Sequence, residues 1–327
     1  MNRISLPRTS LAVSPLCLGT AFFGADIDQA TSFALLDRFV ERGGNFIDTA
    51  RIYSDWAPGE RHRSERLLGD WLETRGHRSS LVIATKGAHP ELETPTVPRS
   101  SAAEIRTDLE GSLRSLRVDA VDVYWLHRDD PSRPVEHFID LLNAFLREGL
   151  IRSFGASNWT ADRLRAAHDY AQRSGQKGFV ANQPLWSLGS RHAHPSPIHG
   201  LVRYDPAAHA FHHETGLAVI PYSSQASGFF SKLALPADRR PPGLGKHAFH
   251  TPPNIAAGEI VARLAEEKGV APSAIVLAYL WSRSFPVVPI VGCRTIEQLD
   301  DSIRAVPVRL TDEERQALET ASDSGLT

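Results

Sequence analysis

Short apolar runs alternate eight times along the chain with longer segments whose apolar residues recur at helical spacing. The apolar runs predict strands at 15–20, 45–47, 81–86, 121–127, 151–155, 179–183, 217–220 and 287–290. The other segments predict helices at 29–42, 64–76, 135–148, 206–214, 255–268, 272–283, 295–304 and 311–321, with two more that begin at Ser101 and Thr160. Because the strands are apolar on both faces, we expect a buried parallel sheet covered by helices. Eight repeats favour an α/β fold of the (β/α)8 TIM-barrel type over an open sheet.

Local patterns refine this architecture at both ends of the chain. Residues 4–13 alternate around a turn and predict a β-hairpin across the barrel floor. Ser101 and Glu104 form a capping-box pattern at a helix start. The loop 231–253 is rich in proline and glycine and is interpreted as a cofactor cover rather than a domain boundary. We therefore expect residues 1–327 to form one domain, with extra helices at the C-terminal end.

Composition excludes several classes of protein. The net charge is −2, with 42% apolar and 23% charged residues, so neither a nucleic-acid surface nor an acidic tail is indicated. No apolar run approaches the length of a membrane span or a signal peptide. The two cysteines, Cys17 and Cys293, are too few for a disulfide scaffold and fit a reducing, cytoplasmic location.

Ionisable residues stand at the ends of three successive predicted strands. Asp48 follows the strand 45–47, with Tyr53 five residues later, while Lys86 and His127 end the next two strands. Each residue alone is more often a helix cap, a packing residue or a rim charge. Because the carboxyl ends of neighbouring parallel strands lie on one face, the four side chains are expected to converge there.

This set of residues resembles the catalytic tetrad of the aldo-keto reductases. The resemblance runs from about residue 3 to about residue 320 and continues through Gly155-Ala-Ser-Asn158, Ala181-Asn-Gln183, Tyr222-Ser223 with Gly228, and Pro289-Ile-Val-Gly292. It implies an NADPH-dependent carbonyl reductase that acts on a small-molecule aldehyde or ketone. Two departures affect the expected adenosine contacts: Ser224, Gln225 and Ala226 replace the usual Pro-Leu-Gly, and Asp301-Ser302 replaces a Glu-Asn pair.

The chemistry of carbonyl reduction is consistent with the roles that the resemblance implies. Tyrosine is a weak acid, with an ordinary pKa of about 10, and an adjacent ammonium lowers that pKa by favouring the phenolate. We therefore predict Tyr53 as the general acid, Lys86 and Asp48 as the pair that tunes it, and His127 as the residue that orients the carbonyl oxygen.

Cofactor contacts are expected on the later strand ends, since no Gly-x-Gly-x-x-Gly or Walker-A pattern is present. The resemblance places the nicotinamide carboxamide at Ser157, Asn158 and Gln183, with Trp186 stacked on the ring.

Barrel loops after strands seven and eight commonly bind phosphate, and Arg294 offers a guanidinium for the 2′-phosphate. Because Gln298 stands where many relatives carry a second arginine, we predict NADPH with weaker binding of NAD. The full expected set is Gly19, Thr20, Asp48, Ser157, Asn158, Gln183, Trp186, Tyr222, Ser223, Ser224, Gln225, Ser227, Gly228, Gly292, Arg294, Thr295, Gln298, Asp301 and Ser302.

Substrate contacts are predicted in the loops that follow the strands. The expected lining residues are Phe22, Trp56, His89, Arg128 and Trp159. A polar rim of Arg51, Arg128 and His89 beside tryptophans suggests a sugar or a short hydroxy-carbonyl. His192, His194 and His199 are interpreted as solvated loop residues rather than metal ligands, so no metal is expected.

Two other functions are compatible with parts of this pattern. Lys86 could act as a Schiff-base nucleophile in a lyase, although a lysine beside an aspartate is harder to deprotonate than one in an apolar pocket. The chain could also be a nucleotide-binding, redox-sensing module without turnover, although such a module has no need of a proton donor. The natural substrate, the direction of the reaction and the oligomeric state leave no signal in the sequence.

Overall fold

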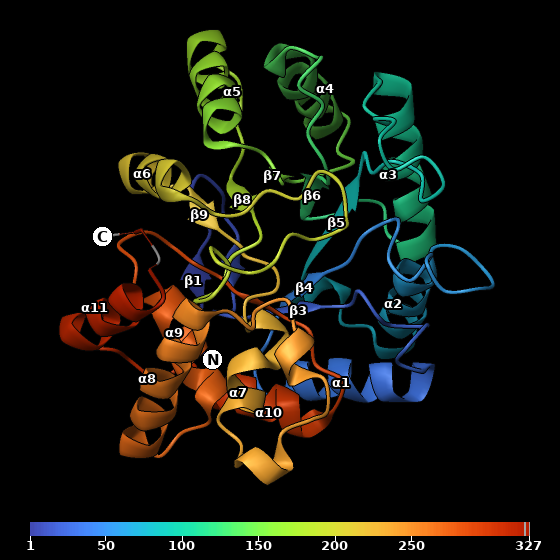
Figure 1. Ribbon diagram of the computed structural model, residues 1–327. Helices are drawn as coiled ribbons and strands as arrows, with labels where there is room; N and C mark the ends of the chain where they lie inside the picture. Colours follow the sequence, from blue (N-terminus) through green and yellow to red (C-terminus); the bar gives the residue numbers. More distant parts are fainter. Residues whose placement is uncertain (324, 327) are drawn as a thin grey trace.

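Eight parallel strands form the centre of the computed structural model, which describes residues 1–323, 325 and 326 (Figure 1). They are β3 (Cys17–Gly19), β4 (Phe46–Asp48), β5 (Val82–Gly87), β6 (Val123–Leu126), β7 (Phe154–Ser157), β8 (Ala181–Gln183), β9 (Ala218–Val219) and β10 (Ile290–Val291). Their order is β10-β3-β4-β5-β6-β7-β8-β9. A bridge between Val219 and Val287 joins the two edges, so the sheet closes into the expected (β/α)8 barrel.

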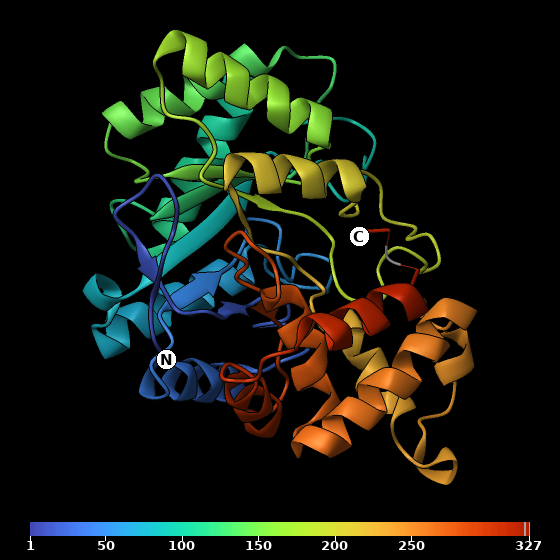
Figure 2. The same cartoon turned by 90° about the vertical axis from the view of Figure 1, so that its left-hand side faces the viewer.

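Helices follow the strands and cover the outside of the barrel (Figures 1 and 2). They are α1 (Gln29–Glu41), α2 (Arg63–Arg75), α3 (Ala102–Leu116), α4 (Val135–Arg147), α5 (Ala161–Ser174), α6 (Pro206–Thr215), α7 (Phe229–Leu233), α8 (Pro252–Lys268), α9 (Pro272–Trp281), α10 (Ile296–Arg304) and α11 (Asp312–Ala321). Ser101 and Glu104 make the predicted capping box, which satisfies the first free amides of α3. Thr160 caps α5 as expected. None of the helices in the described residues is long and apolar enough to cross a membrane.

All eight predicted strands begin later in the structure than in the sequence pattern, and two of them begin three residues later. Ile151 makes only an isolated bridge to Val121, and regular pairing of β7 starts at Phe154. In the predicted strand 287–290, Pro289 has no N–H to donate, and the regular ladder starts at Ile290. The carboxyl ends of both strands are displaced little, so the residues that follow them still reach the barrel mouth.

The loop 231–253 contains more structure than its composition suggests. Its first three residues belong to α7, which is anchored by the buried Phe229 and Phe230, and short 3-10 turns follow. Pro252 and Pro253 occupy the first positions of α8, three residues before the predicted start. Proline is favoured there because the first amides of a helix have no partner within it.

The barrel interior is filled by side chains rather than left open. Phe46, Trp125 and Ile220 belong to a buried cluster contributed by several strands. The hairpin of β1 (Ile4–Ser5) and β2 (Ala12–Val13) adds to that cluster through the buried Leu6 and Val13, and so closes the amino-terminal end of the barrel. Figure 2 shows the hairpin, in dark blue, at that end.

Candidate active site

The carboxyl ends of β4, β5 and β6 bring four ionisable side chains together at the open mouth of the barrel. Asp48 is the last residue of β4, Lys86 lies near the end of β5, and His127 directly follows β6. Tyr53 lies in the turn after β4, where its amide bonds to the carbonyl of Ala50 at 3.1 Å. The expected convergence of these four residues is therefore present.

The ammonium of Lys86 is the centre of this group. Its Nζ lies 2.5 Å from Asp48 Oδ2 and 2.7 Å from the hydroxyl of Tyr53, and it donates to the carbonyl of Thr49 at 2.9 Å. Lys86 is 0% exposed and Asp48 is 1% exposed. Water therefore reaches neither member of the ion pair, and the hydroxyl of Tyr53 is held against a fixed positive charge.

The charge state of Lys86 follows from the carboxylate beside it. Burial is the largest influence and opposes the ammonium, but Asp48 and Tyr53 outweigh it and raise the pKa of Lys86 above its usual value. Burial also dominates at the phenol and raises the pKa of Tyr53, while Lys86 acts in the opposite direction. The ammonium of Lys86 lowers the pKa of Tyr53 as predicted, but the opposing effect of burial is larger.

His127 is neutral in this environment. Burial lowers its pKa well below the usual value, and the positive charges of Arg128 and Lys86 act in the same direction. Its Nδ1 has no hydrogen-bond partner among the described residues. Its ring lies edge-on to Tyr53, with 5.9 Å between the ring centroids. A neutral imidazole at this position can orient a polar oxygen through its single N–H, but that N–H is too weak an acid to supply a proton.

Comparison with known proteins connects this geometry to a family. The model of the aldo/keto reductase family matches residues 15–323. The chain belongs to that family. This aldo/keto reductase is 33% identical to a norsolorinic acid reductase of Emericella nidulans, over 97% of the chain and 80% of that protein. It is 31% identical to an uncharacterized oxidoreductase of Bacillus subtilis, over 96% of the chain and 93% of that protein. It is 29% identical to a putative aryl-alcohol dehydrogenase of Saccharomyces cerevisiae, over 97% of the chain and 85% of that protein.

The predicted carboxamide partners lie beside the tetrad at the ends of β7 and β8. Gln183 Nε2 donates to Asp48 Oδ1 at 3.0 Å, and Ser157 Oγ donates to the Gln183 carbonyl at 2.9 Å. Asn158 accepts from the hydroxyl of Tyr222 at 2.7 Å. On the opposite side, Gly19 pairs with Asp48 in the β3–β4 ladder, and the hydroxyl of Thr20 contacts Ser64. These residues form one connected polar layer with the tetrad in this aldo/keto reductase.

Two tryptophans predicted at the site lie inside the protein instead. Trp186 is 1% exposed and stacks on Tyr204, with 4.1 Å between the ring centroids. Trp159 is also 1% exposed and packs edge-on against Phe179. This geometry does not support the predicted stacking of Trp186 on a nicotinamide or a substrate contact for Trp159. Tyr222 is half-buried, and its hydroxyl is bonded to Asn158 beside the tetrad.

The loop after β9 has a backbone suited to an anion. Ser223, Ala226, Ser227 and Gly228 all have positive φ, between 51° and 73°. Residues in this left-handed conformation turn successive amides toward one side and form nests that bind anions. The buried Ser224 donates to the carbonyl of Ile290 at 2.5 Å, which fixes the loop to β10.

The loop after β10 lies beside it and carries the remaining predicted cofactor contacts. Thr295 caps α10, and Gln298 Oε1 accepts from the amide of Arg294 at 2.8 Å. The two loops are linked where Gln225 donates to Ser302 at 3.2 Å.

Two predicted contacts have partners within or next to these loops: Asp301 pairs with Arg304, and Arg294 pairs with Asp26 at 3.0 Å. Gly292 is exposed, with open space around its α-carbon.

Apolar side chains surround the mouth of the barrel. The large hydrophobic residues exposed among the described residues are Phe22, Trp56, Leu92, Val97, Ile198 and Leu235. All of them lie in loops that follow strands β3, β4, β5, β8 and β9. Trp56 contacts both Phe22 and Tyr53 edge-on, at centroid distances of 6.0 and 6.4 Å. The side of the rim that carries Phe22 and Trp56 is therefore aromatic.

The predicted polar rim is smaller than expected. His89 lies close to His127, with 4.7 Å between the ring centroids, and burial lowers its pKa to about 4. Arg128 is half-buried and donates to the His127 carbonyl. Arg51, in contrast, turns away from the mouth: it donates to Ser115 at 3.1 Å and lies 3.6 Å from the buried Glu65. Among the described residues, no group of three or more His, Cys, Asp or Glu side chains is arranged to hold a metal.

Sequence reasoning missed the support behind Lys86 and Tyr53. Glu65 is fully buried and accepts from Thr85, the neighbour of Lys86, at 2.5 Å. Asp55 accepts from the amide of His62 at 2.5 Å and so closes the loop that carries Tyr53 and Trp56. The contact of Glu65 with Thr85 left a signal in the sequence, a glutamate among the apolar positions of helix 64–76. The contact of Asp55 with His62 depends on the path of a loop and left none.

Proposed function

We propose that this protein reduces an aldehyde or ketone to the alcohol with NADPH, and that Tyr53 supplies the proton. The observation that carries the proposal is the contact of the Tyr53 hydroxyl with a buried, charged Lys86. Removal of the phenolic proton leaves a negative oxygen 2.7 Å from that ammonium, which stabilises it. Asp48 holds Lys86 in place on the other side. Membership in the aldo/keto reductase family supports carbonyl reduction in general.

The protein's own groups have distinct parts in the proposed step. Tyr53 donates its proton to the carbonyl oxygen as that oxygen gains negative charge, and the phenolate left behind is stabilised by Lys86. The neutral His127 orients the carbonyl oxygen by a hydrogen bond. NADPH, when bound, supplies the hydride to the carbonyl carbon. The apolar rim excludes water from this site, which strengthens the electrostatic contacts inside it.

The residues at the ends of β7 to β10 fit a nicotinamide dinucleotide. Ser157, Asn158 and Gln183 would hold the carboxamide beside the tetrad, and Tyr222 would face the ring. The left-handed backbone after β9 would take the pyrophosphate. The start of α10, with Thr295 and Arg294, would take the adenosine end.

A Schiff-base lyase is less well supported than a reductase. An amine attacks a carbonyl only in its neutral form, and Asp48 and Tyr53 raise the pKa of Lys86. No observation favours a redox-sensing module that lacks turnover over an enzyme.

Cofactor choice is expected to depend on Arg294, which is half-exposed. Its guanidinium pairs with Asp26, so the carboxylate of Asp26 would compete with the 2′-phosphate of NADPH for the same charge. We predict that Arg294→Ala weakens NADPH binding by about tenfold and leaves NADH binding nearly unchanged, because only NADPH carries the phosphate. Titration of both reduced cofactors by fluorescence would measure the two affinities.

Asp26→Asn is the matched control for that experiment. It removes the competing charge while the guanidinium remains, so NADPH affinity should rise by about two- to fivefold, as expected for an exposed ion pair. Equal losses for NADPH and NADH in Arg294→Ala would assign the selectivity to another group.

The substrate class that fits the mouth best is an aromatic or otherwise apolar carbonyl compound. The sugar expectation depended on Arg51, Arg128 and His89 beside tryptophans, but Arg51 turns toward Ser115 and Trp159 is buried. Trp56 and Phe22 remain, next to Tyr53. The names of the relatives, which include a norsolorinic acid reductase and a putative aryl-alcohol dehydrogenase, support the same class.

We therefore expect benzaldehyde to be reduced with a higher kcat/KM than glyceraldehyde when NADPH consumption is followed across a panel of carbonyls. Trp56→Ala should lower kcat/KM for benzaldehyde by about two- to tenfold, the value of one aromatic contact, and leave glyceraldehyde unaffected. Val97→Ala, also exposed in a mouth loop, is the control and should change neither value. A higher kcat/KM for glyceraldehyde would restore the sugar hypothesis. No NADPH consumption with any carbonyl would count against the reductase itself.

A further inference from the structure

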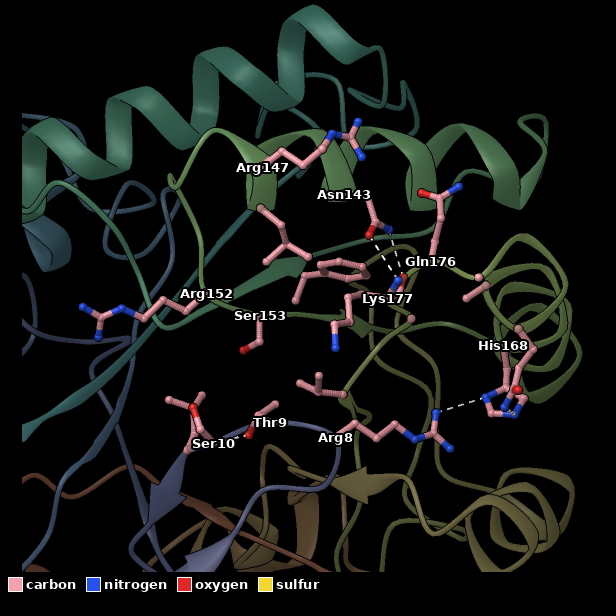
Figure 3. A pocket seen from close by; sticks show the side chains of 18 residues that line it. Arg8, Thr9, Ser10, Asn143, Arg147, Arg152, Ser153, His168, Gln176 and Lys177 are labelled. Carbon is pink, nitrogen blue, oxygen red and sulfur yellow. Dashed lines mark hydrogen bonds between the residues drawn. The ribbon is translucent and has the colours of Figure 1, made fainter.

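A cavity lies beside the hairpin turn, at the closed end of the barrel (Figure 3). Its volume is about 1000 Å³, which is large for a small-molecule site. One wall is the turn of the hairpin, around Arg8 and Leu11, and the other is formed by residues at the ends of α4 and α5. Leu11 and Leu146, which are half-buried, supply an apolar surface to the same cavity, backed by the buried Phe154 and Val180. The cavity is called here the basic floor pocket.

Positive charge is concentrated in the basic floor pocket. Arg8, Arg147, Arg152 and Lys177 line it, and none of its lining residues is an aspartate or a glutamate. Figure 3 shows Lys177 pointing into the pocket, with Arg147 and Arg152 at its edges. A cavity with this lining has a positive potential that favours anions.

Most of these cations lack an acidic partner. Among the described residues, the side chains of Lys177 and Arg147 form no ion pair or hydrogen bond. Arg8 contacts His168 Nδ1 and the carbonyl of Thr215, both at 3.1 Å, and neither is an acid. Arg152 alone is neutralised, by Asp122 at 2.5 Å. Lys177 and Arg8 therefore have no acidic partner, and Arg147 forms no ion pair but interacts electrostatically with the neighbouring Glu148.

A role in helix stability accounts for only part of this charge. Arg147 lies in the last turn of α4, where a cation interacts favourably with the helix dipole. Lys177 lies three residues beyond the end of α5, and Arg8 lies in the hairpin turn. The segment of Lys177 is held rigidly, since Asn143 donates to its carbonyl at 2.9 Å and accepts from its amide at 3.2 Å.

We propose that the basic floor pocket binds a small molecule that carries a phosphate group next to an apolar ring. The phosphate is recognised by Lys177 and Arg8, and Arg147 reaches it from the edge of the pocket. The ring packs on Leu11 and Leu146. This site is separate from the proposed cofactor site, because it lies at the amino-terminal end of the barrel, behind the filled interior.

The test is calorimetric titration of the full chain with two probes, inorganic phosphate and phenyl phosphate, at constant ionic strength. We expect phenyl phosphate to bind more tightly than phosphate, because only the ester fills the apolar part of the pocket. Lys177→Ala combined with Arg147→Ala should weaken phenyl phosphate binding by about tenfold or more. Both side chains are exposed and form no ion pair, so the midpoint of thermal unfolding should fall only by the small contribution of Arg147 to the dipole of α4.

A matched control removes two charges elsewhere. Arg114 and Arg239 are exposed, lie outside the pocket and make no side-chain contact among the described residues. Arg114→Ala with Arg239→Ala should leave phenyl phosphate binding intact.

An equal loss of affinity in both double variants would mean nonspecific charge attraction and would overturn the proposal. If only Arg294→Ala weakened the binding of phenyl phosphate, the probe would be bound at the proposed cofactor site, and the proposal would be overturned as well. Equal affinity for the two probes would overturn the apolar part and leave a site for free phosphate.

Discussion

Tyr53→Phe should lower kcat for carbonyl reduction by roughly a hundredfold or more, while NADPH still binds. The substitution removes one oxygen, the atom that lies 2.7 Å from Lys86, and keeps the ring. His127 cannot replace the lost acid, since burial lowers its pKa well below the usual value and keeps it neutral. Stopped-flow measurement of NADPH oxidation, with cofactor affinity titrated separately, would give both quantities.

The pH dependence gives this prediction a second readout. Reduction needs the protonated phenol, and burial raises the pKa of Tyr53 above its ordinary value of 10.0. The wild-type rate should therefore stay level through neutral pH and decline only as strongly alkaline pH deprotonates the phenol. In Tyr53→Phe the residual rate should lack that alkaline decline. A variant that kept most of its kcat would require another proton donor.

Lys86→Met should damage both catalysis and stability. It leaves the carboxylate of Asp48 buried without its counter-ion, a change that typically costs about 3–5 kcal/mol of unfolding free energy. It also removes the charge that stabilises the Tyr53 phenolate, so kcat should fall by roughly a hundredfold or more. Denaturant unfolding and turnover, measured on the same preparation, would test the two effects together.

The double variant Lys86→Met with Asp48→Asn separates those effects. Removal of the carboxylate should restore much of the lost stability, because no unpaired charge remains buried, but it should not restore turnover. Recovery of turnover in the double variant would contradict the proposed role of Lys86.

The pH dependence of stability distinguishes the single variant further. Burial already raises the pKa of Asp48. Without Lys86 the folded state should bind a proton there more readily than the unfolded state. Stability of Lys86→Met should therefore be greatest at acid pH and fall as the pH rises toward neutrality. The double variant should lose this dependence.

Much of the fold could be predicted from periodicity, and the reason is physical. A strand buried on both faces must be apolar throughout, and a covering helix must show one apolar side, so the two elements leave different patterns. The convergence of Asp48, Lys86 and His127 followed from the rule that parallel strands end on one face. Tyr53 was identified by its nearness to Asp48 in the chain.

The parts that could not be predicted depend on how loops turn. An arginine or a tryptophan in a loop leaves the same pattern whether it faces the mouth or the interior. Arg51 turns back toward the buried Glu65, and Trp186 packs on Tyr204, because the folded loops leave polar and aromatic partners there. The basic floor pocket joins the hairpin turn to residues more than 130 positions away, as between Arg8 and Asn143, and no local pattern marks such a site.

The hairpin that closes the barrel floor also determines from which side reactants can enter. Leu6 and Val13 close one end, and the interior is packed, so the residues that the structure describes leave no passage through the barrel. A cofactor and a carbonyl compound must then both enter the active site through the open mouth of the barrel. The nicotinamide would occupy the deeper position, against Gln183 and Asp48, and a substrate seated first would obstruct it. Turnover should accordingly follow a compulsory order, in which the dinucleotide arrives first and leaves last, with the alcohol departing in between.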